Sequence, residues 1–252
     1  MRILAEHIRY TAGTKFGTSR EVFRDLSLLV ESGECLGVIG REGSGKTTLL
    51  NLLGGLVPPS GGSLFLDGVN MGAAPDRAGG IRRRMGFTFQ FPEEQFLSPT
   101  VDEEFRSLFR VRGIPEGERD GRRDAALRAA GLVEPGTGAR SPFTLSLGES
   151  RRLALAFVSA LRPAAAFLDE PTSGLDASGA ACARSIVEGL LAGGCTVVIA
   201  THDLEFLSGV ARSVLILTEG GIAARGEAAA ILADRSLLAA HGYPRPPESL
   251  IR

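Results

Sequence analysis

The sequence lacks the features that would mark a structural metal site, a nucleic-acid surface or a membrane span. Its three cysteines, Cys35, Cys182 and Cys195, form no CxxC pair and show no metal-ligand spacing, which fits a reducing compartment. The 28 Lys and Arg residues nearly balance 29 Asp and Glu residues, whereas a nucleic-acid partner would favour a basic surface. No apolar run reaches the roughly 18 residues that a membrane span needs.

The first ten residues are strand-like. The segment MRILAEHIRY contains charges throughout and does not resemble a signal peptide. We therefore expect a cytoplasmic protein without a nucleic-acid partner, although docking on a membrane protein stays open. With 252 residues, 44% of them hydrophobic, the chain suits one large domain or one domain with an inserted subdomain.

Strand-like and helix-like segments alternate along most of the chain, which predicts a mostly parallel sheet. The expected strands span residues 4–10, 21–30, 35–40, 61–68, 85–90, 164–171 and 195–203, with a hairpin at 213–226. The expected helices span residues 45–56, 177–194, 204–211 and 228–234.

The middle of the chain differs from this alternation because it is charged and helical in period. Helices are expected over Val101–Arg112, Glu116–Ala130 and Ser146–Leu161. The pattern predicts one domain at 1–235, with a core at 1–90 and 162–235 around a helical subdomain at roughly 91–161. Residues 236–252 are expected to form a C-terminal tail, since the segment HGYPRPPESLIR holds four residues that break helices and strands.

The segment GREGSGKTT fits the phosphate-loop pattern G-x-x-x-x-G-K-[ST]. It follows an apolar strand and opens a helix, and this context makes a chance glycine-rich turn improbable. The glycines let backbone N–H groups approach a phosphate, and the helix N-terminus adds partial positive charge. Lys46 can reach the β- and γ-phosphates, and the Thr47 hydroxyl can bind Mg²⁺. The predicted phosphate-binding residues are Gly40, Arg41, Glu42, Gly43, Ser44, Gly45, Lys46, Thr47 and Thr48.

Acidic and polar residues follow three other expected strands. Asp169 and Glu170 end the buried strand AFLDEP, at the sheet edge where ligands bind in such folds. Asp169 can hold Mg²⁺ through water, and Glu170 can orient the attacking water; a helix-capping acidic pair is the alternative. Gln90 ends MGFTFQ and can reach the metal or the water. His202 can bond the γ-phosphate, although a lone histidine is more often structural.

The order of these motifs resembles that of an ABC-transporter nucleotide-binding domain. The phosphate loop, Gln90, LSLGE, FLDEP, SGLD and TH occur in the order and spacing of that family over roughly residues 1–232. The segments FQFPEEQFLSPTVDEE and SPFTLSLGE are similar to ATPase subunits of energy-coupling-factor importers of cobalt, nickel and vitamins. The resemblance implies an α/β P-loop NTPase fold of RecA type, with antiparallel strands on the N-terminal side and the helical subdomain inserted.

The resemblance also implies function and partners. Two such domains, identical or related, pack head to tail, and each ATP with its Mg²⁺ lies between one phosphate loop and the partner's signature, here Ser146, Leu147, Gly148 and Glu149. Asp176 would contact the opposite phosphate loop, and Glu170 and His202 would support hydrolysis. The implied site for Mg²⁺ comprises Thr47, Gln90 and Asp169. An integral membrane scaffold and a substrate-binding subunit would place the protein peripherally on the cytoplasmic face of the cell membrane.

In the family that this chain resembles, the segment equivalent to FPEEQF contacts short helices of the membrane scaffold protein. Phe91 and Phe96 would then be exposed apolar contacts, with burial of both in the core as the alternative. The resemblance implies that a membrane partner, rather than this chain, selects the transported substrate, a metal ion or a vitamin.

Two positions depart from the family pattern. The signature reads LSLGE where LSGGQ is usual, so Leu147 replaces a glycine, which is compatible with a turn only if φ is negative. Arg151 and Arg152 are expected to offset the Glu149 carboxylate. The adenine base usually stacks on an aromatic residue near position 12, which is Ala12 here; Tyr10 is our first candidate and Phe16 the second.

Two other functions compete with an importer ATPase. One is an ABC-type ATPase of nucleic-acid maintenance or translation, but those chains usually hold two nucleotide domains or a very long coiled-coil insertion. The other is a regulatory partner that binds ATP and hydrolyses it slowly. Leu147 favours that role, whereas Glu170 and His202 oppose it.

The substitution Leu147→Gly tests whether the altered signature is weakened. We expect it to raise ATP turnover of the reconstituted complex, because glycine removes a bulky side chain beside the nucleotide. Phosphate release at saturating ATP measures the effect, and unchanged or lower turnover would count against a weakened signature.

Overall fold

The computed structural model describes residues 1–13 and 19–243 of the chain. A central sheet of six strands runs in the order β10-β9-β3-β8-β7-β6, and a second sheet of four strands runs in the order β2-β1-β4-β5. The central strands are β3 (Cys35–Ile39), β6 (Met85–Thr88), β7 (Ala165–Asp169), β8 (Thr196–Ala200), β9 (Ser213–Thr218) and β10 (Gly221–Glu227). The second sheet comprises β1 (Ile3–Gly13), β2 (Ser19–Val30), β4 (Gly61–Leu66) and β5 (Val69–Asn70).

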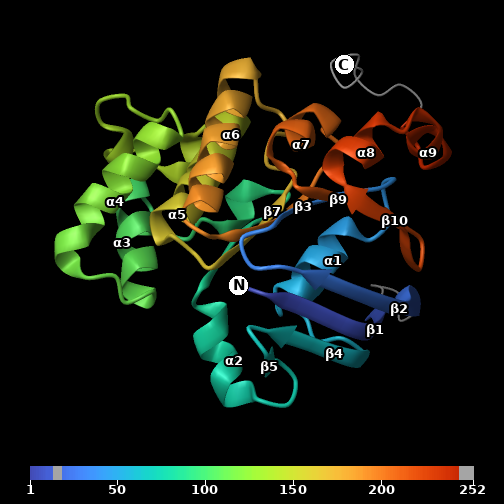
Figure 1. Cartoon of the computed structure of the whole chain (residues 1–252). Helices are drawn as coiled ribbons and strands as arrows, with labels where there is room; N and C mark the ends of the chain where they lie inside the picture. Colours follow the sequence, from blue (N-terminus) through green and yellow to red (C-terminus); the bar gives the residue numbers. More distant parts are fainter. Residues whose placement is uncertain (14–18, 244–252) are drawn as a thin grey trace.

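The central sheet is parallel except at β10, and the second sheet is antiparallel. This confirms the predicted fold class. The middle strands of the central sheet are apolar on both sides because each side faces a separate core. In β8, Val197 and Ile199 contact the core under α5–α7, whereas Val198 and Ala200 contact the core shared with α1 and the second sheet. Figure 1 shows these layers on either side of the central sheet.

Helices cover both faces of the sheet. They are α1 (Lys46–Leu53), α2 (Pro75–Arg82), α3 (Val101–Val111), α4 (Glu116–Ala129), α5 (Leu147–Leu161), α6 (Ala177–Ala192), α7 (Leu204–Val210), α8 (Ala228–Ala233) and α9 (Arg235–Ala240). Short 3-10 turns lie at η1 (Pro92–Gln95), η2 (Thr137–Ala139) and η3 (Pro142–Thr144). Among the described residues, no helix is long and apolar enough to cross a membrane.

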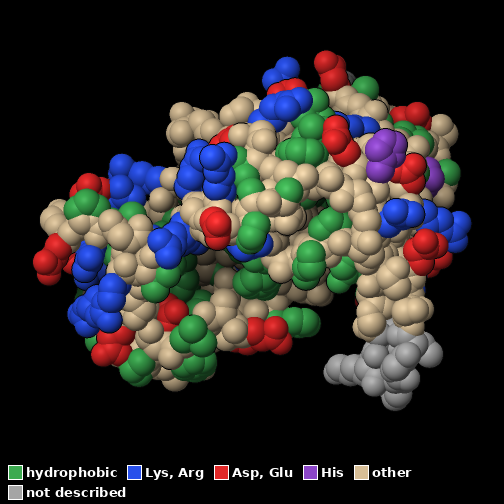
Figure 2. Space-filling view, turned by 90° about the horizontal axis from the view of Figure 1, so that it is seen from below, with side chains coloured by type: hydrophobic (Ala, Val, Ile, Leu, Met, Phe, Trp, Pro, Cys, Tyr) green, Lys and Arg blue, Asp and Glu red, His purple; other side chains and the backbone are tan. Residues whose placement is uncertain are grey.

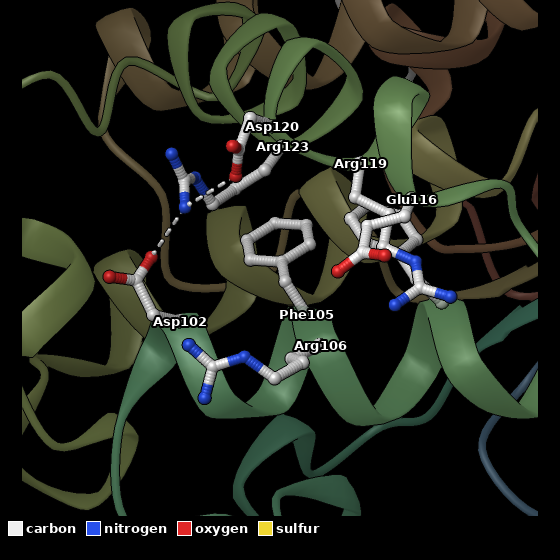
Figure 3. A pocket seen from close by; sticks show the side chains of 8 residues that line it. Asp102, Phe105, Arg106, Glu116, Arg119, Asp120 and Arg123 are labelled. Atoms are coloured by element: carbon white, nitrogen blue, oxygen red, sulfur yellow. Dashed lines mark ion pairs between the residues drawn. The ribbon is translucent and has the colours of Figure 1, made fainter.

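The predicted helical insertion corresponds to α3, α4 and α5, which lie at one end of the molecule (Figure 1). Its core is aromatic: the buried Phe105 packs edge-on against Phe157 with 4.6 Å between ring centroids, and Phe96 packs on the same ring. A charged pocket opens between α3 and α4, where Arg123 lies 3.3 Å from Asp102 and 3.2 Å from Asp120 (Figure 3).

The C-terminal part of the chain folds further than predicted. The expected start of a tail, residue 236, falls inside α9, where Leu238 is fully buried. The segment through Tyr243 therefore packs on the domain, and the tail residues 244–252 lie outside the described residues. The sequence also gave no indication of β5 or α2.

The surface carries both signs of charge. Figure 2 shows Lys and Arg side chains interspersed with Asp and Glu side chains on the face that it presents. This distribution agrees with the formal net charge of −1.

Candidate active site

The phosphate loop lies where the sequence places it, between the end of β3 and the start of α1. Gly45 precedes α1 with φ of 98°, and a Cβ there would lie 2.9 Å from Val22 Cγ1, so only glycine fits. No described side chain caps the N-terminus of α1. Its first N–H groups and the helix dipole therefore form a seat for an anion.

Lys46 and Thr47 place a cation and a hydroxyl at this seat. Lys46 Nζ donates to the carbonyls of Gly40 at 2.8 Å and Arg41 at 3.2 Å, which holds the ammonium over the loop. Thr47 Oγ1 donates to Asp169 Oδ2 at 2.6 Å. The structure thus brings the predicted pair Thr47 and Asp169 into contact.

Asp169 and Thr47 offer the oxygen ligands that Mg²⁺ prefers. Asp169 is buried, and desolvation raises the pKa of its carboxyl although the hydrogen bond from Thr47 opposes that rise. A divalent cation would favour the ionised form of this carboxyl. Mg²⁺ commonly uses one or two carboxylates together with substrate phosphates, so these residues fit it. Among the described residues, no group of three or more His, Cys, Asp and Glu forms a metal cage.

Glu170 and His202 also meet, at the carboxyl ends of β7 and β8. His202 Nδ1 lies 3.0 Å from Glu170 Oε2, and Thr201 Oγ1 donates to the same oxygen at 2.9 Å. The Glu170 side chain is 14% exposed and the His202 ring 68% exposed. The glutamate is thereby fixed by two partners, while the imidazole faces outward.

The backbone of Glu170 is strained. Its φ is +49°, a left-handed conformation that costs a non-glycine residue about 1–2 kcal/mol. Its carbonyl accepts from Arg151 Nη1 at 2.5 Å, and its N–H donates to the Ala200 carbonyl at 2.8 Å. These bonds hold the strained peptide and aim the side chain toward Thr201 and His202.

Arg151 joins this peptide to the segment after β6. It is buried, burial lowers its pKa, and Nη2 donates to the Gln90 carbonyl at 3.1 Å. Gln90 was expected to end the strand, but β6 ends at Thr88, and the Gln90 side chain is exposed. Its proposed contact with a metal or water therefore stays a prediction.

The signature forms a capping box at the start of α5. The Ser146 hydroxyl accepts from the Glu149 N–H at 3.2 Å, and Glu149 Oε2 accepts from the Ser146 N–H at 2.9 Å. The prediction that Arg151 and Arg152 offset Glu149 is wrong. Both point to backbone carbonyls, whereas Arg140 pairs with Glu149 at 2.7 Å.

The backbone at Leu147 avoids the positive φ that its bulky side chain would disfavour. It is the first residue of α5 and does not have a positive φ. Its side chain is 53% exposed and lies against Gly174, where a Cβ would come within 3.2 Å of Leu147 Cδ2. Next along the chain, Asp176 caps α6 by accepting from the Gly179 N–H at 2.7 Å. The predicted contact of Asp176 with an opposite phosphate loop remains a prediction.

The first adenine candidate lies on the second sheet. Tyr10 of β1 is opposite Phe23 of β2, and the Phe23 ring lies 3.1 Å from a Cβ built on Gly45. The second candidate, Phe16, lies outside the described residues. Stacking of adenine on Tyr10 therefore stays a prediction, and Phe23 and Val22 are loop neighbours that the sequence did not reveal.

Comparison with known proteins assigns the family. The family model described as ABC transporter matches residues 23–173, more than half of the chain. The chain belongs to the ABC transporter family.

Curated relatives make the subgroup clear. The chain is 38% identical to the cobalt import ATP-binding protein CbiO of Rhodobacter capsulatus, over 88% of this chain and 79% of that protein. It is 35% identical to the energy-coupling factor transporter ATP-binding protein EcfA2 of Symbiobacterium thermophilum, over 94% of this chain and 81% of that protein. The predicted resemblance to energy-coupling-factor ATPases is confirmed, and the chain is an ABC-type ATPase.

Solved structures agree. A bacterial ABC transporter cassette solved as a dimer superposes with a TM-score of 0.80 at 26% identity, covering 90% of this chain and 98% of that chain. The cbiO1 protein of Clostridium perfringens, described as part of the ABC transporter complex cbiONQ, gives 0.73 at 26% identity and covers 94% and 92% of the two chains.

Sequence reasoning missed three groups in this ABC-type site. The Ser146–Glu149 capping box was visible as the spacing S-x-x-E before an apolar run. Arg151 bonds carbonyls 19 and 61 residues away in the chain, and no local pattern marks such contacts. The same holds for Tyr243, whose hydroxyl reaches Gly40.

The signature carboxylate is expected to give the fold a defined acid sensitivity. Bonds from Arg140 and then Ser146 lower the pKa of Glu149 from 4.5 to about 2. Because the folded pKa is depressed, the carboxylate stabilises the folded state above pH 4.5, and this contribution is lost as the pH falls to about 2.

The variant Glu149→Gln keeps the shape of the cap and removes its charge. We expect its melting temperature to lie below that of the wild type at pH 7, and the gap to shrink as the pH falls from 4.5 toward 2. Thermal unfolding across this range measures the gap, with the exposed Glu188→Gln as control. A gap that does not depend on pH would contradict the assignment.

Proposed function

We propose that this chain is the ATP-binding and hydrolysing subunit of an energy-coupling-factor importer that takes up a metal ion or a vitamin. The observation that carries the proposal is the convergence of Thr47–Asp169 and Glu170–His202 beside the phosphate loop, at one edge of a parallel sheet. The names of the curated relatives, cobalt import and energy-coupling factor, support the class of transporter.

In this proposal the phosphate loop and its nine predicted residues bind the ATP phosphates. Lys46 neutralises phosphate charge, and the uncapped N–H groups of α1 donate to phosphate oxygens. Thr47 and Asp169, with Gln90, would hold Mg²⁺, which would neutralise the charge that develops on the phosphate oxygens during transfer of the γ-phosphoryl group to water. Tyr10 would stack on the adenine.

Glu170 would act as the general base for hydrolysis. One carboxylate oxygen is engaged by Thr201 and His202, and the side chain stays partly open to a water. Proton transfer from the attacking water to Glu170 would raise the nucleophilicity of that water. His202, whose side chain is largely exposed, would contact the γ-phosphate.

The signature would serve the nucleotide bound by a partner ATPase, identical or related. The N-terminus of α5 adds a helix dipole at Ser146 and Gly148, and Asp176 would reach the opposite loop. Closing this pair around ATP and reopening it after hydrolysis would drive the transporter. A likeness to a cassette solved as a dimer, and to one in a state bound to ADP and Pi, supports this pairing.

The membrane partners would meet an exposed apolar surface beside the Gln90 segment. Phe91 is 53% exposed, Leu97 is 87% exposed and Phe143 is 59% exposed. Phe96, in contrast, is buried, so neither sequence-based alternative for the two phenylalanines holds for both. The exposed trio would contact a membrane scaffold that also carries a substrate-binding subunit, placing the chain on the cytoplasmic face of the cell membrane.

The role of Glu170 is tested by Glu170→Gln. We expect this variant to lower the kcat of ATP hydrolysis by roughly 10²–10⁴-fold, the range for loss of a general base, and to retain ATP binding. Phosphate release by the reconstituted complex measures the loss. The control is Glu205→Gln, an exposed acid in the first turn of α7. Turnover close to the wild-type rate would show that Glu170 is not the base.

A further inference from the structure

The hydroxyl of Tyr243 bonds the first residue of the phosphate loop in two ways. It accepts from the Gly40 N–H at 3.0 Å and donates to the Gly40 carbonyl at 3.2 Å. These residues lie 203 positions apart in the chain. The contact joins the C-terminal end of the described structure to the loop that carries the phosphate-binding amides.

The position of this hydroxyl is fixed by the segment 235–243. Leu238 of α9 is fully buried, and the Tyr243 N–H donates to the Leu238 carbonyl at 2.9 Å. Between them, Gly242 adopts φ of +98° and approaches Arg41, whose Cγ would lie 2.8 Å from a Cβ at that position. The segment therefore contacts the loop at Gly40 and Arg41, and α9 lies next to α8 (Figure 1).

Gly40 cannot be held by a side chain of its own. Its φ is +155°, and a Cβ would lie 2.3 Å from the Leu217 carbonyl oxygen, so only glycine fits. Its peptide groups are oriented by hydrogen bonds instead. The carbonyl accepts from Tyr243 and also from Lys46 Nζ at 2.8 Å. A change at Tyr243 would therefore act on the same carbonyl that positions the phosphate-binding lysine.

We propose that Tyr243 is a positioning residue that sets the geometry of Gly40 and thereby the affinity of the phosphate loop for nucleotide. This inference rests on the proposed function, since it assumes that the loop binds ATP. The segment 235–243 acts as a strap on the loop. Because coupling between two sites is reciprocal, bound nucleotide stabilises the strap to the same extent that the strap favours nucleotide.

The variant Tyr243→Phe removes the hydroxyl and keeps the ring. We expect the Kd for Mg-ADP to rise roughly three- to tenfold, the span of one neutral hydrogen bond. The KM for ATP should rise with it while kcat changes little, because the contact acts before the chemical step. Calorimetric titration with Mg-ADP, which is not hydrolysed, measures the Kd. Ser236→Ala, in the same segment 235–243 but with a hydroxyl that donates to Asp234, is the matched control.

Hydrogen exchange separates positioning from a merely structural role. In the wild type, Mg-ADP should slow amide exchange of residues 235–243, and Tyr243→Phe should abolish that protection and speed exchange at residues 40–46. A structural role alone would change exchange at 235–243 only, whether or not nucleotide is present.

The results separate failure of the Tyr243 inference from failure of the proposed ATPase function. Equal Kd values for wild type and Tyr243→Phe would overturn the role of Tyr243 and leave the ATPase proposal intact. The same conclusion would follow if Mg-ADP did not change amide exchange of residues 235–243 in the wild type. A wild-type protein that binds neither Mg-ADP nor Mg-ATP would overturn both.

Discussion

The parallel register of β3, β8, β7 and β6 is the constraint on which the site depends. Parallel strands end at one edge of a sheet, so the residues that follow each of them meet although they are far apart in the chain. Gly40 follows β3, Thr201 and His202 follow β8, Asp169 ends β7, and Gln90 comes two residues after β6. The bond from Thr47 to Asp169 spans 122 positions of sequence and exists only because β3 and β7 flank the same strand.

A second dependence links this edge to the signature helix. α5 begins at the Ser146 capping box and, one turn later, buries Arg151 against the carbonyls of Glu170 and Gln90. The helix that would face a partner's nucleotide is thus bonded to the strained peptide of the expected base. Burial of this guanidinium is partly offset because backbone carbonyls accept from its Nη1 and Nη2 groups. Arg151 therefore links the signature helix directly to the backbone of Glu170.

The sequence predicted the residues that belong to recognisable motifs and missed contacts that no motif marks. The phosphate loop, Asp169, Glu170 and the start of α5 depend on spacing within about a dozen residues, which a pattern captures. Arg140 rather than Arg151 pairs with Glu149 because the turn before α5 brings residue 140 back to the helix start, and no periodicity encodes that return.

The split between Phe91 and Phe96 likewise has a tertiary cause. Phe96 is drawn under the helical subdomain by the rings of Phe143 and Phe157, while Phe91 precedes η1 at the surface. The glycine and prolines around Tyr243 in the sequence predict a C-terminal tail there. Its anchoring depends on the burial of Leu238 and on a loop 203 residues earlier in the chain.

Sedimentation velocity of Glu170→Gln with and without Mg-ATP tests the central claim most directly, namely that nucleotide is shared between one phosphate loop and a second copy's signature. The account predicts a monomer without nucleotide, a dimer with Mg-ATP, and no dimer when Lys46→Ala is added. A protein that binds Mg-ATP and forms no dimer at any nucleotide concentration, either alone or with a related partner ATPase, would contradict the account.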